Sequence, residues 1–326
     1  APGFTGNFLM NEPVAKSHPK VRQVSVSAEE AGQRIDNFLA RYLKGVPRSH
    51  IYRILRRGEV RVNSGRIKAH YKVRAGDTVR IPPVRVSEKG ASAPRALSGK
   101  GLAAHILFEN TRCLVLDKPA GMAVHGGSGV SHGVIEALRA ERPDAPYLEL
   151  AHRLDRDTSG CLVIAKRRSF LRAFHEQLRN GAVEKYYLAL VAGNWEGGER
   201  RVTAPLRKNT LKGGERIVQV DDEGKEAVTL FRPVDRFRQA TLVEAELHTG
   251  RTHQIRVHAA HIRHPLAGDA KYGDRAFNVD LRKLGLRRMF LHAHRVVFTD
   301  TEGEPVDVAA PLDGRLQAVL DRLESP

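Results

Sequence analysis

The irregular order of helix-like and strand-like segments is the feature that most constrains the fold of this 326-residue chain. After Leu102, apolar periodicity predicts strands over residues 114–116, 161–165, 186–192, 227–231 and 241–247, and helices over residues 134–140, 169–179 and 253–262. Strands and helices do not alternate regularly here, as they would in a doubly wound parallel sheet. The pattern is instead typical of an α+β domain whose strands are mostly antiparallel.

A smaller module precedes this domain and has a different pattern. Apolar residues at helical intervals predict one helix from Ile35 and a second helix that Pro47 can begin and Gly58 can end. Residues 60–62 and 77–81 alternate between apolar and polar side chains, which predicts short strands. Short helices followed by short strands indicate a small, compact domain.

Composition suggests where the domains begin and end. Residues 1–22 contain Pro, Asn and Lys without a sustained period, so we expect a flexible tail there. Residues 87–102 are mostly small and polar, which is typical of a linker. The prediction is a small α/β domain over residues 23–86 and a larger domain over residues 103–326.

A large positive charge indicates an anionic partner. The chain has 54 Lys and Arg against 37 Asp and Glu, and 54 − 37 = +17. Such a charge increases self-repulsion in the folded state, so a polyanion that needs it is the usual explanation. Nucleic acid is the first candidate and an anionic membrane surface is the second. A merely basic, soluble surface is the alternative that charge alone leaves open.

Two further features concern the compartment. Cys113 and Cys161 lie in apolar runs without a CxxC partner, so we interpret them as core residues of a protein in a reducing compartment. The sequence has no apolar stretch as long as a membrane span and no secretory-type N-terminus. We therefore expect a cytoplasmic protein that has no membrane partner.

The segment that can carry chemistry is His152-Arg153-Leu154-Asp155-Arg156-Asp157-Thr158-Ser159-Gly160. It is a polar loop between apolar flanks, and it places two carboxylates beside arginines. A carboxylate beside an arginine stays ionised, so it suits a nucleophile or an electrostatic partner better than an acid. The alternative is a turn stabilised by Arg–Asp pairs, which these residues alone leave open.

The string His-Arg-Leu-Asp-x-x-Thr-Ser-Gly resembles the signature of the RNA pseudouridine synthases that modify ribosomal and transfer RNA. The resemblance implies a catalytic domain with a central mixed, mostly antiparallel sheet. It also implies that Asp155 is the catalytic aspartate and that Arg153 is associated with the flipped nucleotide's place in the RNA helix. Asp157 falls on a variable position of the signature, so we expect no role for it.

Three other segments resemble motifs of the same family, and the matches together cover roughly residues 106–312. The segments are residues 118–126, 185–189 and 250–258. The resemblance implies that His125 binds RNA, that Tyr187 stacks on the target base and that Arg256 pairs with the catalytic carboxylate. It also implies that Ile255, the neighbour of that arginine, lines the pocket.

Residues 32–81 resemble an S4 domain, a family that docks a helical pair on structured RNA. Arg53, Arg56 and Arg57 share one face of the second predicted helix, so we expect them to contact RNA phosphates. Members of the synthase family that act on transfer RNA generally resemble this chain without the S4 module. The expected partner is therefore large-subunit (23S) ribosomal RNA or a pre-ribosomal particle, bound by a monomer that needs no cofactor.

Alternative functions have specific requirements in the sequence. A metal hydrolase would use the histidines within residues 253–264, but no HExxH motif is present and we expect no metal site. A glycosidase-like enzyme needs an acid among its two carboxylates, whereas the arginines flanking Asp155 and Asp157 oppose that role. A non-catalytic RNA-binding assembly factor would need neither Asp155 nor Arg256. A transfer-RNA-directed synthase stays open as the other enzymatic alternative.

Overall fold

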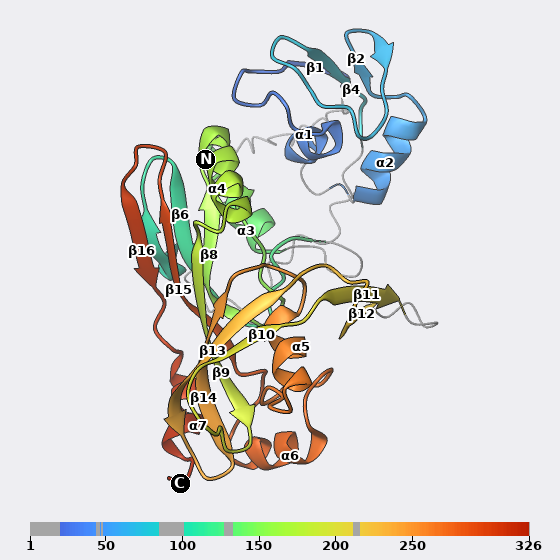
Figure 1. The fold of residues 1–326 in the computed structure, drawn as a ribbon. Coiled ribbons are helices and arrows are strands. Elements are labelled where there is room, and N and C mark those ends of the chain that lie inside the picture. Colours follow the sequence, from blue (N-terminus) through green and yellow to red (C-terminus); the bar gives the residue numbers. More distant parts are fainter. Residues whose placement is uncertain are drawn as a thin grey trace, which may run out of the picture. The chain divides into compact units, whose positions relative to one another are not determined.

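The computed structural model describes residues 20–43, 46, 48–84, 101–126, 133–210 and 216–325. Contacts within the chain define two compact units, residues 1–91 and 92–326 (Figure 1). Most of the predicted tail and linker lies outside the described residues, and so does Pro47. The predicted domain borders therefore stay predictions.

In its described part, the first unit combines two α-helices with a four-stranded antiparallel sheet of order β1-β4-β2-β3. The elements are β1 (Arg22–Ser25), α1 (Ile35–Tyr42), α2 (Arg48–Arg56), β2 (Arg61–Val62), β3 (Gly65–Arg66) and β4 (Thr78–Ile81). Both predicted helices are confirmed, and their apolar residues, such as Phe38 and Ile54, are buried in one core. Gly58 follows α2 with a φ of +69°, a conformation that favours glycine at the end of a helix.

Across residues 101–126, 133–210 and 216–325, the second unit builds ten strands into one sheet. Its main path is β10-β13-β14-β9-β15-β8-β6-β5, with β16 paired to β15 and β7 paired to β8. The strands are β5 (Ile106–Glu109), β6 (Cys113–Lys118), β7 (Glu149–Leu150), β8 (Ser159–Ala165), β9 (Glu184–Ala192), β10 (Arg200–Thr203), β13 (Val228–Arg236), β14 (Ala240–Leu247), β15 (Leu291–Thr299) and β16 (Pro305–Ala309). Among the pairings of these described strands, only β15 with β8 is parallel, so the predicted mixed, mostly antiparallel sheet is confirmed.

Helices cover both faces of this sheet. They are the 3-10 helix η1 (Leu102–His105), α3 (Val134–Glu141), α4 (Arg168–Arg179), α5 (Gln254–His261), α6 (Arg275–Lys283) and α7 (Gly314–Asp321). Successive side chains of a strand point to opposite faces, so Leu162 packs with residues of α3 and α5 while Val163 packs with residues of α4. Leu190 of β9 packs with α6 and α7. Every residue of β8 is buried, which explains its uninterrupted apolar sequence.

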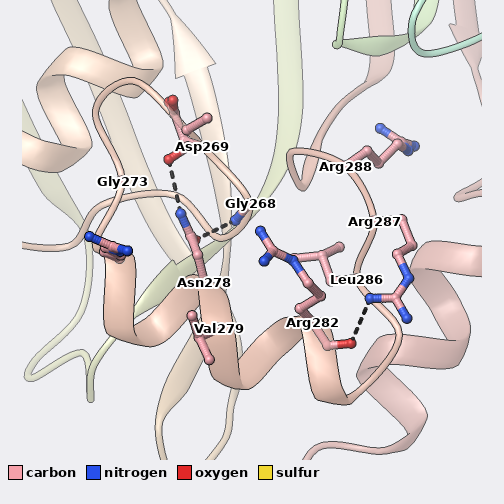
Figure 2. Close-up of a pocket in the computed structure, with 11 residues that line it drawn as sticks. Gly268, Asp269, Gly273, Asn278, Val279, Arg282, Leu286, Arg287 and Arg288 are labelled. Atoms are coloured by element: carbon pink, nitrogen blue, oxygen red, sulfur yellow. Dashed lines mark hydrogen bonds between the residues drawn. The ribbon is translucent and has the colours of Figure 1, made fainter.

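All elements predicted for the second unit are present, but others were not predicted. β13 extends to Arg236, whereas the sequence predicted that this strand ends at residue 231. The last residues of the strand are exposed and lack apolar alternation, so the apolar pattern did not reveal them. The elements that were not predicted include β15, β16, α6, α7 and the separate hairpin of β11 (Leu206–Thr210) with β12 (Arg216–Val220). Helix α6 borders a pocket that is rich in arginine (Figure 2).

Two predictions from composition have counterparts in the structure. Cys113 and Cys161 are free and buried, as predicted for core residues. None of the helices in the described residues combines the length and the apolar character that a membrane crossing requires.

Candidate active site

The loop over residues 151–158 connects β7 to β8 and carries the predicted chemistry. The Thr158 N–H donates to the Asp155 carbonyl at 3.1 Å, which closes a turn around the carboxylate. Gly160, the second residue of β8, has a φ of +104°, and a Cβ at this position would lie 2.2 Å from the Ala293 carbonyl oxygen. Only glycine therefore allows β8 to approach β15 this closely, and this approach fixes the exit of the loop.

Hydrogen bonds from a buried lysine, Lys118, also hold this loop in place. The Lys118 side chain is fully buried, and its Nζ lies 2.9, 2.7 and 3.0 Å from the carbonyl oxygens of Pro119, Met122 and Arg156. Burial lowers the pKa of Lys118 to about 7, whereas three carbonyl acceptors favour the ammonium form, which alone offers three N–H donors. Lys118 thereby ties the turn at residues 119–122 to the segment that follows Asp155.

Arg256 joins two carboxylates of the site, Asp155 and Asp269. Its Nε and Nη2 donate to Asp269 at 2.7 and 2.9 Å, and its Nη1 donates to Asp155 Oδ2 at 3.3 Å. Burial opposes the charge of Asp269, but the hydrogen bonds and the charge of Arg256 outweigh it and lower the pKa of Asp269. The predicted pairing of Arg256 with Asp155 is thus present, and Asp269 is the partner that aims it.

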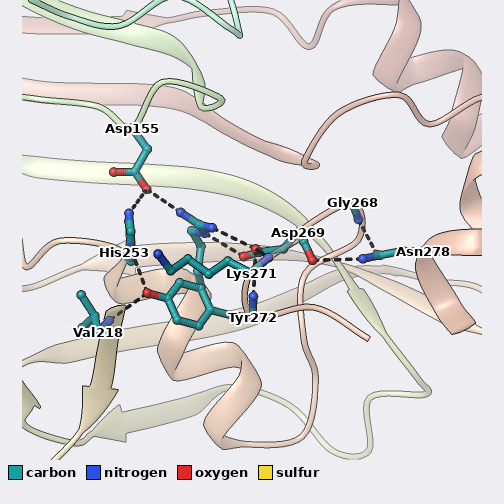
Figure 3. A network of polar contacts seen from close by, with 9 residues as sticks. Asp155, Val218, His253, Gly268, Asp269, Lys271, Tyr272 and Asn278 are labelled. Carbon is teal, nitrogen blue, oxygen red and sulfur yellow. Dashed lines mark hydrogen bonds and ion pairs between the residues drawn. The ribbon is translucent and has the colours of Figure 1, made fainter. Parts of the chain in front are cut away.

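A second chain of contacts reaches Asp155 through His253 (Figure 3). The Val218 N–H donates to Tyr272 Oη at 2.9 Å, so the tyrosine hydroxyl can donate to His253 Nδ1 at 2.8 Å. His253 then carries its hydrogen on Nε2, which faces Asp155 Oδ2 at 3.8 Å. Burial lowers the pKa of His253 against the charge of Asp155, which favours this neutral tautomer. The φ of His253 is +55°, a conformation that is uncommon outside glycine and recurs at functional sites.

The Asp155 carboxylate lies in a pocket of about 770 Å³. Among its described lining residues, five are lysine or arginine and Asp155 is the only carboxylate: Arg153, Arg179, Lys185, Arg251 and Arg256 are the cations. Burial lowers the pKa of Lys185 to about 8, and no carboxylate pairs with it within the described residues. Such a lining suits a polyanionic substrate.

Tyr187 and Ile255 supply the apolar part of this pocket. Tyr187 projects from β9 and is 7% exposed, and Ile255 projects from α5 and is 4% exposed. Burial, together with the charge of Asp155, raises the pKa of Tyr187, so its phenol is neutral at physiological pH. A flat aromatic ring beside a carboxylate offers a base a surface on which to stack.

Comparison with known proteins assigns the chain to a family. A family model described as RNA pseudouridylate synthase matches residues 112–261, and an S4 domain model matches residues 33–79. The ribosomal large subunit pseudouridine synthase C of Yersinia pestis is 55% identical over 307 residues, which cover 93% of this chain and 96% of that protein. The chain belongs to the RNA pseudouridylate synthase family. The protein of the same name from Escherichia coli strain K12 is 55% identical over 312 residues, 94% of this chain and 98% of the relative.

Solved structures of the family share the fold of the catalytic unit. Human RNA pseudouridylate synthase domain containing 4 aligns with a TM-score of 0.57 at 26% identity, covering 69% of this chain and 95% of that chain. Human RNA pseudouridylate synthase domain containing 1 aligns with a TM-score of 0.55 at 23% identity, covering 68% of this chain and 96% of that chain. The predicted fold class, an α+β synthase domain with an S4 domain, and the predicted isomerase class are therefore confirmed.

The structure places the other residues predicted for this pseudouridine synthase as follows. Arg153 lines the active-site pocket, whereas His125 is not among the described residues that line it. Asp157, for which we expected no role, is largely exposed and lies 3.7 Å from Arg156. The three arginines of the S4 domain are exposed at α2 and belong to the first unit: Arg53, Arg56 and Arg57.

The histidines that suggested a metal site have other partners. His258 is fully buried, with Nδ1 2.9 Å from Thr229 Oγ1 and Nε2 2.9 Å from the Ala204 carbonyl. His264 Nδ1 lies 2.8 Å from the Ala192 carbonyl. Within the described residues, no three side chains of His, Cys, Asp or Glu are arranged to hold a metal ion.

Sequence reasoning missed several residues of the pseudouridine synthase site. His253 was within reach, because it lies inside the motif at residues 250–258, but the sequence predicted no role for it. Asp269 and Tyr272 lie on a loop without periodicity or motif, so only the folded chain brings them to Arg256 and His253. Lys118 had a signal in its Lys-Pro-x-Gly context, but that signal did not reveal its three carbonyl partners.

Proposed function

We propose that this pseudouridine synthase isomerises specific uridines of large-subunit ribosomal RNA, and that Asp155, Tyr187 and Arg256 carry the reaction. The contact that supports the site is the 3.3 Å hydrogen bond from Arg256 to Asp155, at the wall of a pocket dominated by cations. The target RNA is supported by relatives that are named for the ribosomal large subunit and that match nearly the whole chain. The S4 domain and the net charge of +17 are consistent with a large, structured RNA.

The reaction begins with removal of the target uridine from its stack, which costs a few kcal/mol. The N1–C1′ bond then breaks, the uracil turns within the pocket, and C5 bonds to C1′. The hydrogen on C5 leaves as a proton and N1 gains a proton, so substrate and product are isomers. The net change is the transfer of a proton from C5 to N1, and no electrons are exchanged with another molecule.

Asp155 acts at the sugar in this proposal. Its carboxylate can bond to C1′ or take a proton from the sugar, and both routes require the ionised form. Arg256 keeps that charge in place, because Asp269 fixes the guanidinium from its other side. His253 presents a neutral N–H toward the same oxygen at 3.8 Å, which adds a second positioning contact without a second full charge.

The remaining pocket residues hold the flipped nucleotide. The ring of Tyr187 stacks on uracil, and Ile255 packs below it. Arg153 is exposed at the pocket, where it can occupy the gap that the flipped nucleotide leaves in the RNA. We also assign RNA contacts to His125 and to the S4 arginines Arg53, Arg56 and Arg57.

The organisation of the protein follows from the same proposal. We infer an RNA-binding domain over residues 23–86, a linker over residues 87–102 and a catalytic domain over residues 103–326. The protein works as a monomer in the cytoplasm, on ribosomal RNA or on a pre-ribosomal particle, and it uses no cofactor.

Mapping pseudouridine in RNA tests the function directly. The purified protein is incubated with unmodified large-subunit ribosomal RNA and, separately, with unmodified transfer RNA. We expect new pseudouridines in the ribosomal RNA, and we expect the same positions to stay uridine in a strain that lacks the gene. Modification of transfer RNA alone would favour the transfer-RNA-directed alternative, and modification of neither RNA would overturn the proposal.

A further inference from the structure

A second pocket, of about 450 Å³, opens beside α6 (Figure 2). Arg275, Val279 and Arg282 line it from α6, where their spacing places them on one face of the helix. Arg287 and Arg288 line it from the segment that precedes β15. Among the described lining residues, four are arginines, and they lie outside the active-site pocket.

Hydrogen bonds within the chain hold the wall of this pocket. Asn278 Nδ2 donates to the Asp269 carbonyl at 3.0 Å, and Asn278 Oδ1 accepts from the Gly268 N–H at 2.7 Å (Figure 2). Gly268 has a φ of +73°, and a Cβ there would lie 2.3 Å from the Arg288 carbonyl oxygen. Because the backbone is pinned at these points, a ligand would meet a site that needs little rearrangement.

Most of the positive charge in the pocket is not neutralised. No carboxylate pairs with Arg275, Arg282 or Arg287 within the described residues, and all three are exposed. Arg288 differs, because it pairs with Asp313 and also donates to Ser159 Oγ at 2.9 Å. The pocket therefore offers an incoming anion three guanidinium groups whose charge no described carboxylate balances.

Among the described lining residues Asp269 is the only carboxylate, and it is turned toward other partners. Asp269 binds Arg256 through both oxygens, and its Oδ1 also accepts from the N–H groups of Lys271 and Tyr272 at 2.9 and 3.1 Å. Its side chain is 0% exposed, so it presents little charge to the pocket. Asp269 is also the wall between the two sites, since it lines this pocket and holds the arginine of the other.

We propose that this pocket binds a backbone phosphate of the substrate RNA, outside the nucleotide that enters the active site. The inference rests on the proposed function, because it needs an RNA substrate that extends past the flipped uridine. Arginine suits phosphate because its planar fork can donate two parallel hydrogen bonds. Val279, which is 42% exposed between two of the arginines, gives the adjoining ribose an apolar surface. Asp269, which lines this pocket, pairs with Arg256, and Arg256 in turn contacts Asp155.

The salt dependence of RNA binding tests this site. In the variant Arg275→Gln with Arg282→Gln, we expect the slope of log affinity against log salt to flatten by roughly 0.7–0.9 for each phosphate that the protein no longer neutralises. KM for long ribosomal RNA should rise while kcat at saturating RNA stays unchanged. The matched control is Lys283→Gln with Arg238→Gln, which removes the same charge from side chains that do not line the pocket.

A second variant leaves all the arginines in place, so a change in its RNA binding cannot result from structural damage caused by removing two arginines. Val279→Glu puts a negative charge on the lining of the pocket and should weaken long-RNA binding, whereas Val279→Gln should not. Equal salt slopes for the double variant and its control would overturn the phosphate site. Unchanged affinity for naked RNA together with weaker binding to ribosomal particles would also overturn it, in favour of an acidic protein segment. Pseudouridine formation by the wild-type protein is measured in parallel, and its absence would instead overturn the proposed function.

Discussion

Asp269, whose side chain is 0% exposed, holds Arg256 through two hydrogen bonds of 2.7 and 2.9 Å and leaves one guanidinium nitrogen for Asp155. The contact from Arg256 to Asp155 is longer, at 3.3 Å. The buried pair with Asp269 therefore sets the orientation of the guanidinium, and the contact with Asp155 depends on it. The planar guanidinium can donate hydrogen bonds to both carboxylates at once. A lysine ammonium in the same place could not reproduce this geometry.

The first prediction concerns Asp269→Asn. The substitution keeps the size of the side chain but leaves the largely buried guanidinium of Arg256 with an incomplete partner, which typically costs about 3–5 kcal/mol for a buried pair. We expect a lower free energy of unfolding in urea and a kcat at least about tenfold lower, which corresponds to about 1.4 kcal/mol in the barrier. Arg256→Lys should show a similar loss. A stable variant with wild-type kcat would contradict the positioning role.

The second prediction concerns Asp155→Asn. Loss of the ionised oxygen at C1′ should abolish pseudouridine formation, by several kcal/mol in the barrier at about tenfold per 1.4 kcal/mol. RNA affinity should stay nearly unchanged, because the pocket keeps all its cations. Asp157→Asn is the control, since Asp157 is largely exposed and lines neither pocket. Turnover of the Asp155 variant within tenfold of the wild type would refute the assignment.

The third prediction tests the series of contacts that links Asp155 through His253 and Tyr272 to Val218 of β12. Tyr272→Phe removes the hydroxyl that joins Val218 to His253. The histidine ring then loses the partner that fixes its tautomer, so we expect kcat to fall by about tenfold or less while KM changes little. His253→Gln should lower kcat similarly, and the double variant should not add to the loss if both act through one contact. Additive losses would show that the two residues act separately.

The fourth prediction is a pH dependence of stability that originates at His152. Its Nε2 accepts from the Val163 N–H at 3.0 Å, and burial lowers its pKa from the usual value near 6.5. Below about pH 6.5 the unfolded chain therefore binds a proton that the folded protein does not. Stability consequently falls as the pH drops through 6.5, by at most about 1.4 kcal/mol per pH unit for one proton. This loss is absent above pH 6.5, where both states are neutral.

Urea unfolding between pH 5 and 8 measures this effect. His152→Gln keeps an acceptor near Nε2 but has no titrating group, so the free energy of unfolding should fall less steeply with acid than in the wild type. Carboxylates contribute equally to both proteins, and the difference between the two curves isolates the histidine. Parallel curves would show that His152 titrates normally in the folded protein.

The site could be predicted from sequence where its residues lie in short strings. Asp155, Tyr187 and Arg256 each lie in a segment that resembles a family motif. Asp269 and Tyr272 have no such context, because their roles arise from a loop that folds back on α5. A single Asp or Tyr in a loop is usually a surface residue, and nothing local marks these two as different.

The fold shows the same division between local and long-range information. β8 was predictable because it is apolar throughout, whereas β15 contains His292, which interrupts the apolar period. That histidine is buried because Ser159 Oγ and the Ala310 carbonyl satisfy its two nitrogens at 2.8 and 3.0 Å. Hydrophobic periodicity cannot detect a polar residue that is paired across the fold. The helices α6 and α7 did have a local signal, since Asp274 and Asp313 cap them by accepting backbone N–H groups.

The fifth prediction addresses the S4 domain alone. Arg53 and Arg56 are exposed on α2, opposite the buried residues of that helix, and we expect them to contact RNA phosphates rather than bases. In Arg53→Gln with Arg56→Gln, the slope of log affinity against log salt should flatten by roughly 0.7–0.9 for each phosphate that α2 no longer neutralises. The control is Arg22→Gln with Arg74→Gln, which removes equal charge from exposed positions outside α2.

The chemical step separates docking by the S4 domain from catalysis. At saturating RNA the kcat of the α2 variant should match the wild type, because these arginines act in binding and not at C1′. In cells, modification should fall unevenly, and the least accessible target uridine should be affected most. If the α2 variant and its control bind ribosomal RNA with the same affinity and salt slope as the wild type, α2 is not the docking surface. The charge of +17 would then act through the catalytic unit, where the two arginine-lined pockets lie.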